Sequence, residues 1–236
     1  MRKHRGPAPE DALFFDPKRL NMLRRAVCDL SWLLQRHYSP HASLKLVGNR
    51  YQLTERERLA IIHAAGDGEP RSAPTAFEAL QGKTLCIDGF NLLITLETAL
   101  GGGIILIGTD NCYRDIANIH GSYSLRAETE HAVELAAKTL KEARIQEALW
   151  LFDRPVSNSG RVAELVNETA RKLSVPMEAH TANEVDSRIR ACTGIAVTAD
   201  SEILSGGVAW FDLAGWIIQK EVKEAALVDL RCRSGA

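Results

Sequence analysis

Four aspartates that end or closely follow short apolar runs restrict the fold of this chain more than any other feature. They are Asp88, Asp153, Asp186 and Asp200. Short apolar runs bounded by polar turns predict buried strands, and the carboxyl ends of parallel strands open onto one crevice of an α/β sheet. Carboxylates gathered there repel one another unless a cation lies between them, and oxygen ligands suit Mg²⁺ or Mn²⁺. The pattern therefore points to metal-dependent phosphodiester chemistry.

Length and composition are those of an ordinary globular protein. The chain has 236 residues, of which 45% are hydrophobic and 25% charged, enough for one large domain or a domain plus a small module. No apolar run approaches the roughly 20 residues of a membrane helix, and no apolar segment directly follows the basic start, so neither a membrane protein nor a signal peptide is expected. The five cysteines are scattered without a C-x-x-C pair. Disulfides and zinc sites are therefore not expected, and a cytoplasmic location is.

Charge is unevenly distributed along the chain. Residues 1–65 carry 12 Lys and Arg against 6 Asp and Glu, a net charge of +6, whereas the remainder carries 17 against 24, a net charge of −7. A basic module joined to an acidic one suits a nucleic-acid enzyme in which the first part holds phosphates and the second holds metal. Small helical domains are also often basic by chance, so both interpretations stay open.

Residues 1–65 predict a basic three-helix module that follows a frayed tail over residues 1–16. The expected helices begin at Pro17, at Pro40 and after Thr54. Proline is favoured in a first helical turn, and a threonine followed three residues later by a glutamate forms a capping box. The second helix is expected to end near Gly48, which places Arg50 in the loop before the third.

After a Gly- and Pro-containing linker over residues 66–80, strand and helix signals alternate. Strands are expected at 84–88, 149–152, 175–180, 194–197 and 207–210. Helices are expected at 126–143, 159–173, 183–191, 200–205 and 213–222. This alternation predicts an α/β domain over residues 81–236, with a mostly parallel sheet and helices on both faces. Residues 92–124 fit neither pattern and are interpreted as an insertion that could form a hairpin beside the site.

Asp88 is the first candidate metal ligand. Gly89 permits a sharp turn after the strand. Asn91 could then hydrogen-bond the carboxylate of Asp88 or a phosphate. Aspartate is also a preferred helix N-cap, and taken alone that alternative explains the pair equally well. The later aspartates favour the metal site.

The other acidic candidates also have structural alternatives. Asp200 falls where a helix would be capped, and Asp186 lies in a first helical turn, where it complements the helix dipole. Asp153 ends a strand in what could be an ordinary connection. Ser157 and Ser159 lead into a helix N-terminus, where free backbone N–H groups could bind a phosphate.

Polar residues of the insertion supply further candidates. They are Asp110, Arg114, Asp115, His120 and Tyr123. An Arg–Asp pair in an ordered loop would explain most of this cluster, and substrate contact by Arg114 is the alternative. The run 101–103 consists of three glycines without a following Lys-Ser or Lys-Thr, so it predicts a flexible turn rather than a phosphate-binding loop.

Taken in order, four motifs resemble those of PIN-like nucleases, most closely the NYN branch. They are Ile87-Asp88-Gly89-Phe90-Asn91, Leu151-Phe152-Asp153, Ala182-Asn183-Glu184-Val185-Asp186-Ser187 and Val197-Thr198-Ala199-Asp200. The resemblance covers about residues 84–215, and the region 92–124 departs from the NYN pattern. The whole chain also resembles an uncharacterised prokaryotic family that joins such a domain to a small one with a Val-Gly-Asn-Arg-Tyr-Gln-Leu motif, here Val47–Leu53.

The resemblance implies a metal-dependent ribonuclease with Asp88, Asp186 and Asp200 as ligands of one or two Mg²⁺ or Mn²⁺ ions. Such ions lower the pKa of a bound water and stabilise charge on the phosphate. Asn91 and Asp153 are expected to orient ligands or water. The candidate substrate contacts are Arg50, Arg114, Ser157 and Ser159. RNA is the expected partner, a homodimer is left open, and the alternative is a non-catalytic RNA-binding or regulatory protein on the same fold.

Overall fold

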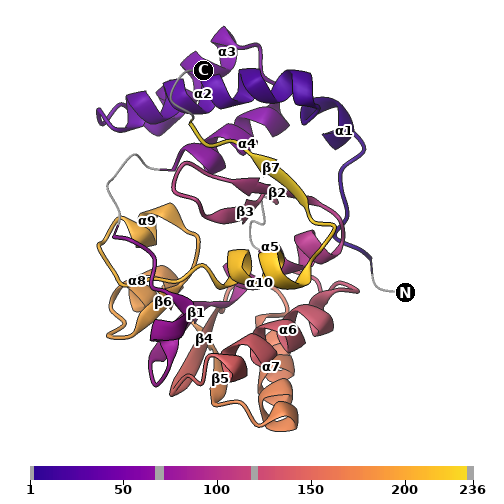
Figure 1. Cartoon of the computed structure of the whole chain (residues 1–236), viewed down its shortest axis with the longest axis vertical. Helices are drawn as coiled ribbons and strands as arrows, with labels where there is room; N and C mark the ends of the chain where they lie inside the picture. The colour runs from indigo at the N-terminus through magenta and orange to yellow at the C-terminus, as the bar shows by residue number, and fades with distance from the viewer. Residues whose placement is uncertain (1–2, 67–71, 118–121, 233–236) are drawn as a thin grey trace.

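The structure is a computed structural model that describes residues 3–66, 72–117 and 122–232. It is an α/β fold with two sheets and an N-terminal helical region (Figure 1). The larger sheet is parallel, in the order β5 (Met177–Ala182), β4 (Glu147–Asp153), β1 (Thr84–Asp88) and β6 (Ile195–Val197). Helices cover both of its faces, which confirms the predicted fold class. Within the described residues, no helix is long and apolar enough to cross a membrane.

Side chains on the two faces of the larger sheet enter two separate hydrophobic clusters. Ile87 and Trp150 lie in the cluster formed with α5 (Gly89–Leu100), α6 (Thr129–Glu142), α7 (Ser159–Leu173) and α10 (Leu213–Glu221). Leu151 lies in the opposite cluster, formed with α8 (Val185–Arg190) and α9 (Ser201–Leu204). Successive strand residues point to opposite faces. Asp88, which pairs in register with Leu151, therefore faces the α8–α9 side.

A second sheet separates α5 from the helical region (Figure 1). Its strand order is β3 (Tyr113–Asp115), β2 (Ile104–Ile107) and β7 (Ala226–Asp229). The antiparallel pairing of β2 with β3 is the hairpin expected in the insertion, whereas β7, which pairs parallel with β2, was not predicted. Ile105 packs toward α5, and Leu106 packs into the module of α2 (Pro17–Leu34), α3 (Pro40–Arg50) and α4 (Glu55–Ala65).

The helix α5 was not predicted either, since residues 92–100 were assigned to an insertion. Nearly all its residues from Gly89 to Ala99 are buried. A helix that is apolar on every side lacks the one-sided periodicity by which helices are recognised, and it belongs in a core. The helix lies between the two sheets, which explains its composition.

The helix starts of the N-terminal module agree with the sequence. Asp16 caps α2 by accepting hydrogen bonds from two backbone N–H groups, and Thr54 forms the expected capping box with Glu57. The end of α3 was predicted too early, because the helix continues through Gly48 to Arg50. Gly48 serves packing instead, since a Cβ there would lie 1.9 Å from the guanidinium of Arg58.

The N-terminal tail is bound to the core, which corrects the expectation of a frayed segment. The Nε of Arg5 donates to the fully buried carboxylate of Glu97 on α5 at 2.9 Å. The hydroxyls of Tyr123 and Thr129 also donate to this carboxylate. Gly101 and Gly103 make room for the tail, because a Cβ would lie 2.5 Å from the carbonyl oxygen of Arg5 at the first position and 3.2 Å from it at the second.

Residues 207–210 do not form the predicted strand. Trp210 makes a single parallel β-bridge to Ala196, beside β6. Gly207 adopts a φ of 71°, a left-handed conformation that interrupts an extended segment. This segment therefore joins the edge strand β6 only at Trp210.

Two disulfides contradict the expectation of none. They join Cys28 to Cys232 and Cys86 to Cys192, with Cα–Cα distances of 5.5 Å and 6.5 Å. The partners are separated by 204 and 106 residues, so no local spacing indicated the pairs and only the fold brings them together. The first ties α2 to the segment after β7, and the second ties β1 to the segment after α8.

Reduction of the disulfides is expected to lower the melting temperature. Loss of a native disulfide typically costs about 2–5 kcal/mol, and each of these closes a long loop. Thermal unfolding with and without a reductant, with thiols counted by mass spectrometry, measures the effect. Two reduced pairs with an unchanged melting temperature would contradict it.

The helical module and the smaller sheet share one hydrophobic cluster. Leu30 and Ile61 of the helices pack with Val228 and Leu230 of the C-terminal strand region. Most arginines of the module are held by internal partners. Arg56 pairs with Asp11, Arg19 with Glu57, and Arg24 donates to the carbonyl of Asp229. The module is therefore docked on the rest of the chain.

Deleting residues 1–65 is expected to cause aggregation or a large loss of stability. The deletion exposes the apolar face of the smaller sheet, and exposed patches of that kind promote association. Size-exclusion chromatography and thermal unfolding of the truncated and full-length chains test this. A soluble truncated chain that melts at the full-length temperature would refute the docked arrangement.

Candidate active site at the edge of the larger sheet

The four predicted aspartates lie at one edge of the larger sheet. Asp153 ends β4, Asp88 ends β1, Asp200 follows β6, and Asp186 lies in the first turn of the helix after β5. Because the four strands are parallel and adjacent, their carboxyl ends open on the same side. Each strand thus brings one carboxylate to a common edge.

Burial and repulsion from the other three carboxylates both act on Asp88. Burial raises its pKa from 3.8 to about 7, and the charges of Asp200, Asp186 and Asp153 add to the effect. The backbone N–H of Asn91, 3.2 Å from the carboxylate, opposes it. Burial and the charge of Asp200 raise the pKa of Asp186, and burial and the charge of Asp186 raise that of Asp153. The edge therefore concentrates negative charge that a cation would compensate.

Asp88 and Asp200 cap helices as well as facing the cleft. The Asp88 carboxylate accepts from the backbone N–H of Asn91 in the first turn of α5, and Asp200 accepts from the N–H groups of Glu202 and Ile203 in α9. The capping alternative left open by the sequence is thus real for both residues. It does not compete with a site, because the caps fix the carboxylates at the sheet edge.

Two polar side chains connect the loops that carry these carboxylates. The hydroxyl of Thr198 donates to Asp88 at 3.2 Å and accepts from the backbone N–H of Asp200 at 3.1 Å. The side-chain oxygen of Asn91 accepts from the N–H of Ala199 at 2.9 Å. The sequence did not indicate this role of Thr198, because its contact with Asp88 depends on the pairing of β1 with β6.

Gly89 has a different role from the one expected. It begins α5 directly after Asp88, so no left-handed turn is required there. A Cβ at Gly89 would lie 2.4 Å from the ring of Phe152 on the neighbouring strand. The glycine therefore permits close packing between the helix start and β4, which keeps Asp88 at the sheet edge.

A cleft of about 540 Å³ opens beside Asp88, Asn91 and Asp200. Its opposite wall comes from the helical module, through Leu34, Pro40, Ile62 and His63. The β3 segment supplies Arg114 and Asp115, which places the insertion beside the site as expected. The cleft therefore lies between the two parts of the chain. No pattern in the sequence indicated that His63 would form part of its wall.

Arg114 lines the cleft, but its guanidinium has structural partners. It donates to the Asp110 carboxylate, to the carbonyl of Ala199 at 2.7 Å and to that of His63 at 3.3 Å. These bonds join the hairpin to α4 and to the loop before α9. Arg114 therefore holds the walls of the cleft together. His120, which belongs to the same predicted cluster, lies outside the described residues.

The other predicted substrate contacts lie away from this cleft. The Ser157 hydroxyl exchanges hydrogen bonds with the backbone of Tyr123, and the buried Ser159 donates to the carbonyl of Arg154. Arg50 is exposed on α3, with its Nε 3.5 Å from the Asp29 carboxylate. Asp153 and Asp186 lie at the sheet edge without lining the cleft itself.

The donor set fits a hard divalent cation in its chemistry. Carboxylate oxygens are the preferred ligands of Mg²⁺ and Mn²⁺, and Asp88 is buried among like charges. Among the described residues, no three His, Cys, Asp or Glu side chains are already grouped to hold a metal ion. Asp186 is exposed and Asp153 half-buried, so solvent and dissolved ions reach both carboxylates.

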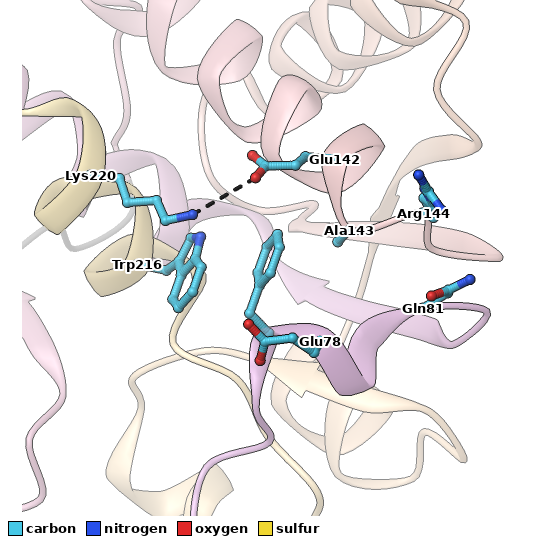
Figure 2. Close-up of a pocket in the computed structure, with 8 residues that line it drawn as sticks. Glu78, Gln81, Glu142, Ala143, Arg144, Trp216 and Lys220 are labelled. Atoms are coloured by element: carbon cyan, nitrogen blue, oxygen red, sulfur yellow. Dashed lines mark ion pairs between the residues drawn. The ribbon is translucent and has the colours of Figure 1, made fainter.

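A second cavity, of about 330 Å³, lies between η1 (Phe77–Leu80), the end of α6 and α10 (Figure 2). Phe77 stacks on Trp216 with ring centroids 4.4 Å apart. The Nζ of Lys220 lies 4.3 Å from the Trp216 ring and 3.8 Å from the Glu142 carboxylate (Figure 2). The ammonium group of Lys220 is thus held by a cation–π contact and an ion pair within the cavity. These contacts are structural, and we assign no chemistry to this cavity.

The fold and the cleft define an α/β protein whose helical module completes an acidic site. Residues 77–216 match the family described as "Domain of unknown function (DUF5616)", and residues 22–69 match "Protein of unknown function (DUF434)". The chain belongs to the DUF5616 family and is 32% identical over 186 residues to "Uncharacterized protein MJ0935" of Methanocaldococcus jannaschii, across 77% of this chain and 88% of that protein. No solved structure gives a significant match. The four aspartates fall in the first match and His63 in the second.

The raised pKa of Asp88 predicts a pH-dependent stability. Between its ordinary value of 3.8 and about 7, the folded chain holds a proton that the unfolded chain releases. The free energy of unfolding without divalent metal should therefore fall as pH rises from 4 to 8, by on the order of 2–4 kcal/mol. Denaturant unfolding across this range measures it. Asp88→Asn should make the profile shallower but not flat, because burial also raises the pKa of Asp115 and of Asp212. Glu164→Gln, which neutralises an exposed carboxylate on α7, should leave the profile unchanged.

Proposed function

We propose that this protein is a metal-dependent ribonuclease that hydrolyses phosphodiester bonds at the acidic edge of the larger sheet. The observation that carries the proposal is the convergence of four aspartates on one edge, with Asp88 buried among the charges of the other three. Asp88, Asp186 and Asp200 would hold Mg²⁺ or Mn²⁺. A bound ion of this kind lowers the pKa of a water and stabilises charge on the phosphate.

The chain's own residues would position the reacting groups. Thr198 and the N–H of Asn91 fix the two oxygens of Asp88. The amide oxygen of Asn91 anchors the loop that carries Asp200, so Asn91 acts as a positioning residue. Asp153, half-buried and close enough for its pKa to respond to Asp186, is suited to accept a hydrogen bond from an attacking water.

The resemblance of the four motifs to PIN-like, NYN-type nucleases supports the same reaction class. RNA as the partner and a cytoplasmic location are parts of this proposal, although the two disulfides remove the cysteine argument on which the location was based. The competing function is a non-catalytic RNA-binding or regulatory protein. One observation favours it, namely that no three metal-ligating side chains are already grouped among the described residues.

Asp88→Asn is expected to reduce Mn²⁺-dependent cleavage of single-stranded RNA by at least about 100-fold. Outer-shell partners of metals already cost 10–100-fold when removed, and Asp88 is proposed as a ligand. The melting temperature without metal should stay level or rise at pH 8, because the substitution removes a repelled buried charge. Cleavage rates and thermal unfolding measure these two effects, with Glu164→Gln as the charge-matched control. Calorimetric Mn²⁺ titration should show weaker metal binding by Asp88→Asn than by the wild type.

The outcomes separate the two functions. Cleavage by Asp88→Asn at the wild-type rate would remove Asp88 from the mechanism. A wild-type chain that neither binds Mn²⁺ nor cleaves diverse RNAs, yet still binds RNA, would support the non-catalytic alternative.

A further inference from the structure

The outer side of the helical module exposes large apolar side chains. Trp32 is 52% exposed, Tyr38 57% and Leu46 62%. A groove of about 320 Å³ runs between α2 and α3, lined by Asp29, Trp32, Leu33, Leu46, Val47 and Arg50. Exposed apolar side chains gathered around a groove mark a binding surface. We call this surface the Trp32 face, made of the groove residues together with Arg25, Arg36, Tyr38 and Lys45.

The charge of the Trp32 face is positive. Arg25, Asp29 and Trp32 follow one another at helical spacing along one stripe of α2, Arg36 lies in the turn just after this helix, and Lys45 is exposed on α3. Asp29 accepts from the Tyr51 hydroxyl at 2.8 Å and lies 3.5 Å from Arg50, so this carboxylate already has partners. None of Arg25, Arg36 and Lys45 forms an ion pair with a described residue. Arg36 is therefore a cation in contact with the Trp32 ring, and Arg25 and Lys45 are further exposed cations on the same two helices.

The arrangement at Trp32 suits a nucleobase. The guanidinium of Arg36 lies 3.8 Å from the centroid of the Trp32 ring and donates to the carbonyl of Trp32 at 3.1 Å. Proteins that bind single strands combine aromatic rings, on which bases stack, with arginines that contribute cation–π contacts and neutralise phosphates. An apolar protein segment would use the rings but would leave the cations without partners.

Adjacent residues of α2 line the Trp32 face and the acidic cleft. Leu33 lines the groove, and its neighbour Leu34 lines the cleft together with Pro40. The connection between α2 and α3, which carries the exposed Tyr38, joins the two surfaces. In Figure 1 the C-terminal end of α2 lies on the same side of the molecule as α9, where the cleft opens.

We propose that the Trp32 face binds the single-stranded RNA that flanks the phosphodiester in the acidic cleft. Bases stack on Trp32 and Tyr38, and Arg25, Arg36 and Lys45 neutralise phosphates. The inference rests on the proposed function, in which single-stranded RNA is the substrate. It gives the basic module a task that its internally paired arginines, Arg19 and Arg56, do not perform.

The test uses the full-length Asp88→Asn chain, which binds RNA without consuming it. Fluorescence anisotropy with a labelled single-stranded RNA of mixed sequence gives the affinity as a function of salt. Trp32→Ala in this background should weaken binding about 10-fold, a typical loss for one stacked base. Trp32→Phe keeps an aromatic ring and should retain most of the affinity. Leu227→Ala is the matched control, since Leu227 is an exposed apolar residue on β7.

The charge component is measured separately. Each phosphate contact on a single strand contributes about 0.7 to the slope of log affinity against log salt. Arg36→Gln should therefore flatten that slope by about 0.7, while Arg161→Gln, on the exposed side of α7, should leave it unchanged. RNA should also quench Trp fluorescence in the Asp88→Asn chain, and the Trp32→Phe variant should lose that quenching.

Three outcomes would overturn the inference, provided that circular dichroism confirms folding. Trp32→Ala could bind RNA as tightly as its parent, or Trp32→Phe could be as defective as Trp32→Ala. Trp32→Ala could also change the sedimentation coefficient without changing RNA affinity, which would assign the face to self-association or another protein. Failure of the nuclease proposal gives a different result from failure of this inference. If RNA binding depends on Trp32 but the wild type cleaves no RNA, only the nuclease proposal is rejected. If the wild type cleaves RNA but binding does not depend on Trp32, only this inference is rejected.

Discussion

The burial of α5 is the constraint on which the rest of the structure depends. The helix is apolar on nearly every side, so water must be excluded from all of it. The larger sheet, the smaller sheet, α6 and α10 together provide that cover. Its one buried carboxylate, Glu97, is stable there because Arg5, Tyr123 and Thr129 supply hydrogen bonds. The N-terminal tail and residues of the predicted insertion are thus held in place by their contacts with one helix.

The same helix also fixes the candidate site. Its N-terminus lies at the end of β1, where Asp88 satisfies a free N–H group and benefits from the positive end of the helix dipole. This cap lowers the pKa of Asp88, whereas the charges of the neighbouring aspartates raise it. Burial also raises this pKa and is the largest of the three effects. The cap fixes the orientation of the Asp88 carboxylate, but no positive side chain of the described residues balances its negative charge against those of the neighbouring aspartates. That combination is what a cation-dependent site requires before the cation binds.

The two family matches describe two parts of one structural unit. The helical module shares a hydrophobic cluster with the smaller sheet, and its α4 and the end of α2 form a wall of the acidic cleft. Arg114 connects these walls through carbonyls of both parts. The inner side of the module therefore forms part of the site, while its outer side stays exposed to solvent. The arginines with internal partners, such as Arg19 and Arg56, are not among the exposed cations of the outer side.

Much of the fold could be predicted from local signals, and much of the site could not. Strands β1, β4, β5 and β6 were recognisable because short apolar runs ended on polar turns, and Asp16 and Thr54 marked helix starts by their capping chemistry. The helix α5 and the strand β7 were missed, the first because it lacks a polar face and the second because its partner β2 is distant in the sequence.

The sequence by itself determined the α/β class and the candidate acidic residues, because strand ends and caps are encoded within a few neighbouring residues. Only the tertiary structure decided that these residues share one sheet edge, that Thr198 bonds Asp88, and that His63 faces them across a cleft. It also paired Cys86 with Cys192 and enclosed Arg5 in the core. Those contacts join residues about a hundred positions apart, and their free energy depends on burial and close packing that no local pattern encodes.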